Sequence, residues 1–398
     1  MFESIPAKKG DSILALMTEY KNDPRTEKMD LGIGIYRNNE GETPIMKAVM
    51  DAQQILLETE PTKAYQGLIG DVEYTEVMQE LLLGGTRAFK RAATLHTPGA
   101  SGALRALADL IATTQPDATV WISNPSYVNH QPIMEKAGLK VGIYPYLNPE
   151  TKLVDETAML AKIAELGKGD VLLLHGCCHN PSGADISPEA WQTIADLANK
   201  NGFLPFVDIA YQGLGDGLDE DARGLQLLAN QVEELLISTS CSKNFGLYRE
   251  RTGAAMVVTN SREQALNTRA LMCELTRGSY SMPPAHGAGI VKIILKDAQL
   301  TRKWKQELAE MTDRVRGLRL ALVKEFQEKT QTSDFDYFAK HKGMFSLTGF
   351  SDAILEKMKA DFGIYIVKGG RINVAGLKEH EIPTLVDAVI KCQGNGNN

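Results

Sequence analysis

The sequence predicts an α/β protein with a mostly parallel sheet sandwiched between layers of helices. Short apolar runs recur along the middle of the chain and alternate with segments that carry apolar residues at helical spacing. Such an alternation is typical of a parallel sheet whose two faces are covered by helices. We expect a ligand to bind beyond the carboxyl ends of the strands. The apolar runs are residues 92–97, 120–122, 171–174, 204–207, 235–238 and 255–258.

The two ends of the chain predict a second, smaller domain. A helix begins at Asp11–Ser12, and residues 31–37 follow as a tight strand close to a ligand. A long helix from about Leu300 to Glu328 carries one apolar stripe, and short strands near 344–348 and 371–374 flank a further helix. The predicted organisation is an N-terminal arm over residues 1–10, a small α+β domain from 11–43 and 311–398, and a large domain from 44–310.

Composition favours a globular protein with small-molecule partners. The 398 residues are 43% hydrophobic, and the net charge of -7 implies no basic face for nucleic acid. No apolar run approaches the length of a membrane span, and no secretory signal is visible. The five cysteines form no framework, which indicates a reducing compartment and a cytoplasmic location. We expect no metal site at Cys177–Cys178–His179, because adjacent cysteines rarely bind one ion together.

The strongest chemical signal is Lys243, a lysine beyond the end of an apolar strand. Burial disfavours the charged form of its amine, and a neutral amine is a nucleophile toward carbonyl carbons. Ser240, Ser242 and Arg251 lie close by in the sequence and offer hydrogen bonds and positive charge to a phosphate. A surface lysine in a turn is the alternative, but it leaves these neighbours unexplained. We predict a Schiff-base lysine that holds a phosphorylated aldehyde cofactor.

Other strand ends supply groups that such a cofactor requires. Asp208 ends an apolar strand, where a protonated pyridine nitrogen would be a suitable partner and the ring would become an electron sink. Tyr211 and Asn180 lie in turns after strands and could donate to a ring oxygen. Ser101 lies in a small-residue turn before a helix, which is a ready site for an anion. For each residue alone, a helix cap or a simple turn is the structural alternative.

Arg371 stands in an otherwise apolar strand within the segment Gly370–Gly376. A buried arginine demands a carboxylate or a phosphate, and its planar fork suits a carboxylate. The sequence therefore predicts a substrate with a carboxylate, although an internal salt bridge is the alternative for Arg371.

Five motifs, taken in order, resemble those of one family. Together they resemble the aspartate and aromatic amino-acid aminotransferases, which are class I, fold-type I enzymes that depend on pyridoxal 5'-phosphate. The resemblance extends from about Leu31 to Gly376. It implies ping-pong transamination with 2-oxoglutarate as the amino acceptor. The motifs are Ser-Asn-Pro-Ser-Tyr-x-Asn-His, His-Gly-Cys-Cys-His-Asn-Pro-Ser-Gly, Val-Asp-Ile-Ala-Tyr-Gln-Gly, Ser-x-Ser-Lys-Asn-Phe-Gly-Leu-Tyr-x-Glu-Arg and Gly-Arg-x-Asn-Val-Ala-Gly.

The resemblance implies a role for each matched residue. Lys243 matches the Schiff-base lysine that also moves a proton, and Asp208 matches the partner of the pyridine nitrogen, with His175 behind it. Tyr127 matches the ring-stacking residue, with His130 nearby. The implied catalytic residues are Lys243, Asp208 and Tyr211. The implied cofactor-binding residues are Ala100, Ser101, Tyr127, Asn180, Asp208, Tyr211, Ser240, Ser242, Lys243 and Arg251, and the implied substrate-binding residues are Gly34, Tyr127, Asn180 and Arg371.

The resemblance also implies a homodimer with active sites at the subunit interface. Tyr65 would bind the cofactor of the neighbouring subunit, and Arg277 would bind the side chain of its substrate. The N-terminal arm would lie on the partner.

Several positions depart from the strict aspartate enzymes of this family. Tyr127 stands where those enzymes usually carry tryptophan, and Ser101 stands where they carry threonine. Ala64 and Met282 replace asparagines and would make the side-chain pocket more apolar. Arg277 remains, so dicarboxylates should still bind. We therefore expect aromatic amino acids to be preferred, with aspartate or glutamate also used.

Other functions stay open at this point. A strict aspartate aminotransferase shares the motifs, and a lyase or decarboxylase would use the same cofactor on the same fold. Arg371 and Arg277 favour aminotransfer, because two substrates must share one site. A ligand-binding protein without activity would not need the combination of Lys243, Asp208 and Arg251. A dehydrogenase is disfavoured, because the sequence contains no complete dinucleotide fingerprint.

Overall fold

The computed structural model describes residues 2–5 and 12–394, and most of the predicted arm over residues 1–10 lies outside them. The helix predicted near the N-terminus is present as α1 (Ser12–Asn22). Within the described ranges, no helix combines the length and the apolar character needed to span a membrane.

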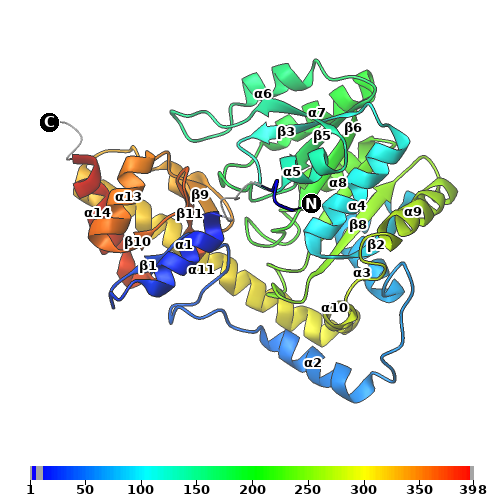
Figure 1. The fold of residues 1–398 in the computed structure, drawn as a ribbon, viewed down its shortest axis with the longest axis horizontal. Coiled ribbons are helices and arrows are strands. Elements are labelled where there is room, and N and C mark those ends of the chain that lie inside the picture. Colours follow the sequence, from blue (N-terminus) through cyan, green and yellow to red (C-terminus); the bar gives the residue numbers. More distant parts are fainter. Residues whose placement is uncertain (1, 6–11, 395–398) are drawn as a thin grey trace.

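A seven-stranded sheet forms the centre of the larger part of the molecule (Figure 1). Its strand order is β2-β8-β7-β6-β5-β3-β4, and β8 alone in this sheet runs antiparallel to its neighbours. The prediction of a mostly parallel sheet is confirmed. The strands are β2 (Ala92–Pro98), β3 (Thr119–Asn124), β4 (Lys140–Pro145), β5 (Asp170–His175), β6 (Leu204–Ile209), β7 (Leu235–Ser240) and β8 (Thr252–Val258).

Helices cover both faces of this sheet because its strands are apolar on both sides. In β7, Leu236 packs into the core cluster beneath α4, whereas Leu235 and Ile237 pack into the cluster on the opposite face. The first face is covered by α4 (Gly99–Thr114), α5 (His130–Lys136) and α9 (Arg262–Arg277). The second is covered by α2 (Lys47–Thr59), α3 (Val72–Leu83), α6 (Glu156–Ile163), α7 (Pro188–Asn201), α8 (Arg223–Gln231) and α10 (Ala285–Lys296).

One long helix, α11 (Ala298–Thr330), runs between the two parts of the molecule (Figure 1) and contributes to two hydrophobic cores. Trp304 and Met311 pack into the core of the large sheet, whereas Leu322 and Phe326 pack into a second core. The predicted long helix with a single apolar stripe is thereby confirmed. The second core also contains residues of α12 (Tyr337–Lys340), α13 (Asp352–Phe362) and α14 (Ile382–Gly394).

Both ends of the chain contribute strands to the second core. β1 (Met29–Asp30) pairs in parallel with β10 (Ile364–Tyr365), and β9 (Phe345–Leu347) pairs antiparallel with β11 (Arg371–Asn373). The strands predicted near 344–348 and 371–374 are confirmed. The domain boundaries at residues 43 and 311 stay a prediction.

Two details of the predicted strands are wrong. Residues 31–37 follow an irregular path, and β1 ends before them. The carbonyls of Ile33 and Ile35 each accept a hydrogen bond of 2.7 Å from Asn373 Nδ2, so side chains replace a neighbouring strand here. The prediction also omitted β4, an edge strand whose side chains are mostly exposed or half-buried and whose apolar residues Val141 and Ile143 are separated by Gly142.

Candidate functional site

A cavity of about 240 Å³ lies at the carboxyl ends of β5, β6 and β7. Gly34, Phe345 and Arg371 close it from the other side, where the two cores meet. Every predicted site residue lines this cavity except Tyr65 and Arg277. The lining residues are Ile13, Gly34, Ala100, Ser101, Tyr127, His175, Cys177, Asn180, Asp208, Ala210, Tyr211, Ser240, Ser242, Lys243, Arg251, Phe345 and Arg371.

Asp208 is the buried anion of the cavity. Its side chain is 7% exposed, and it lies at the end of β6 between His175 on β5 and Ser238 on β7. Its Oδ2 lies 2.9 Å from Nε2 of His130, and its Oδ1 accepts a hydrogen bond of 2.7 Å from Ser238 Oγ. A carboxylate at this depth suits a ligand group that is positively charged.

Lys243 is the nucleophile of the cavity. Burial lowers the pKa of the Lys243 amine to about 8, and the positive charges of Arg251 and Arg371 act in the same direction. Its Nζ lies 4.9 Å from the ring centroid of Tyr248 and 5.8 Å from that of Tyr211. An amine with this pKa is partly neutral near pH 7, and the neutral form attacks carbonyl carbons.

The start of α4 and the side chain of Arg251 form a site for an anion. β2 leads directly into α4 without the separate turn that the sequence predicted, so the N–H groups near Ser101 begin a helix. Gly99 has a φ of +71°, and a Cβ there would lie 2.5 Å from Nη2 of Arg251. The hydroxyls of Ser240 and Ser242, 2.9 Å apart, add donors at the end of β7. This combination of groups suits a phosphate.

Arg371 brings a buried positive charge to the cavity from the second core. Its Nη2 donates to the carbonyl of Gly32 at 2.6 Å, and its guanidinium carbon lies 4.4 Å from the ring centroid of Phe345. The Phe345 ring packs edge-on against Tyr211, with centroids 5.9 Å apart. A Cβ at Gly34 would lie 2.9 Å from this ring, so the small residue there permits the contact. The guanidinium suits a carboxylate of a substrate.

Three further predicted residues add polar and aromatic groups. Nδ2 of Asn180 lies 3.4 Å from the hydroxyl of Tyr211. Burial raises the pKa of the Tyr211 phenol, which therefore stays protonated and able to donate a hydrogen bond. Tyr127 stands edge-on to His130, with ring centroids 5.3 Å apart. The cavity thus offers a donor for an oxygen and an aromatic face for a ring.

Four residues predicted to matter lie outside the cavity of this chain. Tyr65 is 90% exposed, and Arg277 is exposed at the end of α9. Ala64 is also exposed, and Met282 is half-buried without lining the cavity. None of these four residues lines the cavity of the single chain.

Sequence reasoning missed some residues of the site. Ile13, Ala210 and Phe345 are apolar, and such residues look like ordinary core positions in a sequence. Ser238 was missed as well, although it contacts Asp208. Its position as the first hydroxyl residue after Leu235–Leu236–Ile237 in a buried strand is the signal that could have identified it.

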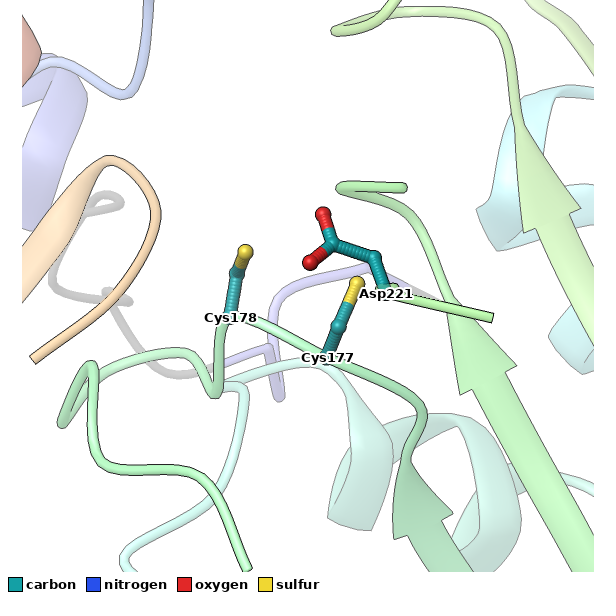
Figure 2. A group of neighbouring side chains, drawn as sticks. All are labelled: Cys177, Cys178 and Asp221. Carbon is teal, nitrogen blue, oxygen red and sulfur yellow. The ribbon is translucent and has the colours of Figure 1, made fainter. Parts of the chain in front are cut away.

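Cys177, which lines the cavity, lies close to Cys178 and Asp221, and Figure 2 shows the three side chains. One ligand atom of each lies within 4.8 Å of the others, a spacing that a metal ion could use. However, Asp221 Oδ2 accepts from the N–H groups of Gly213 and Gly215, and its Oδ1 accepts from that of Asp216. A hydrogen bond with Cys177 and burial both raise the pKa of the Cys178 thiol, which disfavours the thiolate that metals require. We therefore assign this group a structural role.

The chain is similar to proteins of known function over nearly its whole length. The family model for aminotransferase class I and II matches residues 26–389. The aromatic-amino-acid aminotransferase of Paracoccus denitrificans is 45% identical over 381 residues, which are 96% of this chain and 97% of that protein. The aspartate aminotransferase of Salmonella typhi is 43% identical over 393 residues, 98% of this chain and 99% of that protein. A crystal structure of the Burkholderia pseudomallei aromatic-amino-acid aminotransferase, covalently bound to pyridoxal phosphate, matches with a TM-score of 0.96 at 35% identity, covering 98% of this chain and 99% of that one.

Proposed function

The chain belongs to the class I and II aminotransferases, and from this premise we propose that it transfers amino groups from aromatic amino acids to 2-oxoglutarate. Aspartate and glutamate are the further substrates. Relatives at 41–45% identity include both aromatic-amino-acid and aspartate aminotransferases. The observation that carries the proposal is a single cavity that holds Lys243, Asp208 and two arginines.

We propose pyridoxal 5'-phosphate as the cofactor, because the cavity offers a partner for each of its parts. The carboxylate of Asp208 suits a basic ring nitrogen. Arg251 and the start of α4 suit the phosphate, and the position of Arg251 leaves no room for a Cβ at Gly99. Lys243 suits the aldehyde, because its amine has a lowered pKa of about 8.

The mechanism divides between the cofactor and the residues around it. When bound, pyridoxal phosphate supplies an electrophilic aldehyde carbon for the amino group and an electron-poor ring that stabilises negative charge at the substrate α-carbon. Lys243 would hold the aldehyde through Nζ, and its neutral amine, once displaced by the amino group of the substrate, would be the base that moves the α-proton. Asp208 would favour the protonated form of the ring nitrogen, and Tyr211 would donate a hydrogen bond to the ring oxygen.

Arg371 binds the substrate α-carboxylate, which amino donors and 2-oxo acids share. Its charge is held in place by the carbonyl of Gly32 and the ring of Phe345. Tyr127 and Ser101 at the cavity, with Ala64 and Met282 of a partner subunit, favour apolar substrate side chains. Dicarboxylates bind because each subunit receives a second arginine from its partner.

We propose a homodimer in which Tyr65 and Arg277 complete the site of the neighbouring subunit. The 90% exposure of Tyr65 in the single chain supports this arrangement. The arm over residues 1–10, the small domain from 11–43 and 311–398, and the large domain from 44–310 belong to the same proposal. Five free, buried cysteines support a reducing, cytoplasmic compartment.

Cofactor chemistry is tested on the purified protein. Added pyridoxal phosphate should give a visible absorption band that phenylalanine changes and 2-oxoglutarate restores. Reduction with borohydride, followed by peptide mass spectrometry, should find the cofactor attached to Lys243. A protein that binds no pyridoxal phosphate would overturn the proposal, and so would a Lys243→Ala variant with full activity.

Steady-state kinetics test the substrate. The kcat/KM values for phenylalanine, tyrosine, tryptophan, aspartate and glutamate should be measured with 2-oxoglutarate as acceptor. We expect turnover of both classes, with the aromatic donors preferred. Strong turnover of aspartate with almost none of phenylalanine or tyrosine would replace the proposal with a strict aspartate aminotransferase. Release of ammonia or carbon dioxide without amino exchange would indicate a lyase or a decarboxylase.

A further inference from the structure

We propose that Ser238 is a positioning residue that fixes the Asp208 carboxylate for the ring nitrogen of the cofactor. The inference rests on the proposed function and deepens it, because it explains how the chain orients the group that faces the ring. Ser238 does not line the cavity itself, so it acts through Asp208.

The register of the sheet brings these two side chains together. β6 and β7 are parallel, and Asp208 and Ser238 are directly paired in their ladder. Paired residues of neighbouring strands present their side chains on the same face of a sheet. His175 occupies the equivalent position on β5, so three adjacent strands form one row of polar side chains at their carboxyl ends.

Ser238 has one suitable partner for its hydroxyl in this row. The residue is 0% exposed, so it is buried from bulk solvent. On the side away from Asp208, its ladder partner is Ala255 of β8, which offers a methyl group. Its Oγ therefore donates to Oδ1 of Asp208 at 2.7 Å, a short distance for a bond to a charged acceptor. Burying the hydroxyl without that bond would be unfavourable.

Two donors on different oxygens fix the plane of the carboxylate. The final torsion of an aspartate side chain is broad, so a single hydrogen bond leaves the group free to turn. Here His130 Nε2 lies 2.9 Å from Oδ2, and Ser238 binds Oδ1. The remaining lone pairs of Asp208 then point in a constant direction before any ligand arrives. Such preorganisation improves binding of the group that those lone pairs meet.

The fold itself does not require a hydroxyl at position 238. Leu236, on the same face of β7, and Ala255 beside Ser238 both belong to the apolar cluster beneath α4. An alanine at position 238 would extend this cluster and remove only one oxygen atom. Ser238→Ala is therefore a mild change for the sheet and a specific change for Asp208.

The test compares two ligands in binding to the protein stripped of cofactor. The first is pyridoxal phosphate, and the second is 1-deazapyridoxal phosphate, in which a carbon replaces the ring nitrogen. We expect Ser238→Ala to weaken pyridoxal phosphate about tenfold, the effect of losing one hydrogen bond to a charged group. The same variant should bind the deaza ligand within about twofold of the unmodified protein, because that ligand has no nitrogen for Asp208 to meet.

Two further variants serve as controls. Thr239→Ala changes the next residue of β7, which is 3% exposed and points to the opposite face, and it should bind both ligands as the unmodified protein does. Ser238→Thr keeps the hydroxyl and should recover most of the lost affinity for pyridoxal phosphate.

The outcomes separate this inference from the proposed function. Equal weakening of both ligands by Ser238→Ala would show a general structural effect and would overturn the inference. Unchanged binding of pyridoxal phosphate by Ser238→Ala would overturn it as well. Failure of the unmodified protein to bind pyridoxal phosphate would remove the proposed function, a result visible before any variant is compared.

Discussion

The two ends of the cavity are built in different ways. At the sheet end, Asp208 lies near the end of β6, Lys243 follows the neighbouring parallel strand β7, and Asp208 is held by the side chains of His130 and Ser238. At the other end, Arg371 and Gly34 come from opposite ends of the chain, and Arg371 is held by a backbone carbonyl and an aromatic ring. The first arrangement places the proposed reactive groups at the edge of the large sheet, and the second places the proposed recognition group where the two cores meet.

This difference suggests that the groups proposed for the chemical step lie at one end of the cavity and the groups proposed for substrate recognition lie at the other. Changes at the sheet end should lower the rate for every substrate, because all of them use the same reactive groups. Changes at the other end should affect binding, in a way that depends on the substrate. The following experiments test this division, beginning with the largest expected effect.

Replacing Lys243 with alanine should have the largest effect. The variant loses the only amine that lines the cavity within the described residues, and with it both the attachment point and the group that moves the proton. We expect kcat to fall by about 10⁴-fold or more for aromatic and dicarboxylic donors alike. Single-turnover absorption measurements would check this. The surface lysine variant Lys303→Ala is the control, and a residual rate near that of the control would contradict the assignment.

Replacing Asp208 with asparagine keeps the shape of the side chain and removes its charge. We expect kcat/KM to fall by about 10²- to 10³-fold for both donor classes, because the ring nitrogen loses its anionic partner. Kinetics with phenylalanine and with aspartate would measure the two losses. A loss confined to one donor class would contradict the division between the two ends of the cavity.

Replacing Arg371 with leucine should act mainly on binding. The α-carboxylate is common to all substrates, so we expect KM to rise about 100-fold for aromatic and dicarboxylic donors with a smaller change in kcat. Arg277→Ala is the matched comparison, since it should raise KM for aspartate, glutamate and 2-oxoglutarate and leave phenylalanine nearly unaffected. If both variants raised KM for phenylalanine equally, the separate roles proposed for the two arginines would be wrong.

Hybrid dimers would reveal whether Arg277 acts across a subunit interface. When Lys243→Ala and Arg277→Ala chains are mixed, each hybrid dimer should contain one site in which both residues are intact. A mixture of equal parts should therefore regain about a quarter of the unmodified activity toward aspartate, since half of randomly formed dimers are hybrids. Sedimentation would confirm that dimers form and exchange. No recovery from exchanging dimers would place Arg277 in the site of its own subunit.

We expect the smallest effect from the charge of Arg371, which lies at one end of the cavity and influences the pKa of Lys243 at the other. The pKa of Lys243 is lowered to about 8, mainly by burial. The neutral amine therefore becomes more abundant as pH rises through that value. We expect the rate of pyridoxal phosphate uptake by the cofactor-free protein to rise between pH 6 and pH 9 and then to level off. Arg371→Leu removes one nearby positive charge and should shift the midpoint upward. Stopped-flow absorption would measure both midpoints, and a downward shift would contradict the electrostatic link.

Much of the site was predictable because its residues follow strand ends. Asp208, Lys243 and Asn180 each come after an apolar run, and the carboxyl ends of parallel strands meet at one edge of a sheet. The contact between Ser238 and Asp208 depends on the register of β6 and β7, which the order of residues along the chain does not reveal.

The irregular path of residues 31–37 was unpredictable for a related reason. Its carbonyls accept hydrogen bonds from Arg371 and Asn373, which lie at the other end of the sequence. A local pattern of apolar residues cannot signal partners that distant. The prediction omitted the edge strand β4 for a different reason. Most of its side chains are exposed or half-buried, and a glycine interrupts its apolar residues.

The bond between Arg371 and Gly32 spans 339 positions of the chain, and this has a consequence during synthesis on the ribosome. Every residue that lines the cavity, except Phe345 and Arg371, has been made once Arg251 is complete, whereas Arg371 follows about 120 residues later. At typical translation rates that interval is roughly 6 to 24 seconds. Throughout this time the nascent chain contains Lys243 and Asp208 without Arg371, which we propose binds carboxylates. With these proposed roles, a newly made chain would acquire its reactive groups before the group that recognises its substrates.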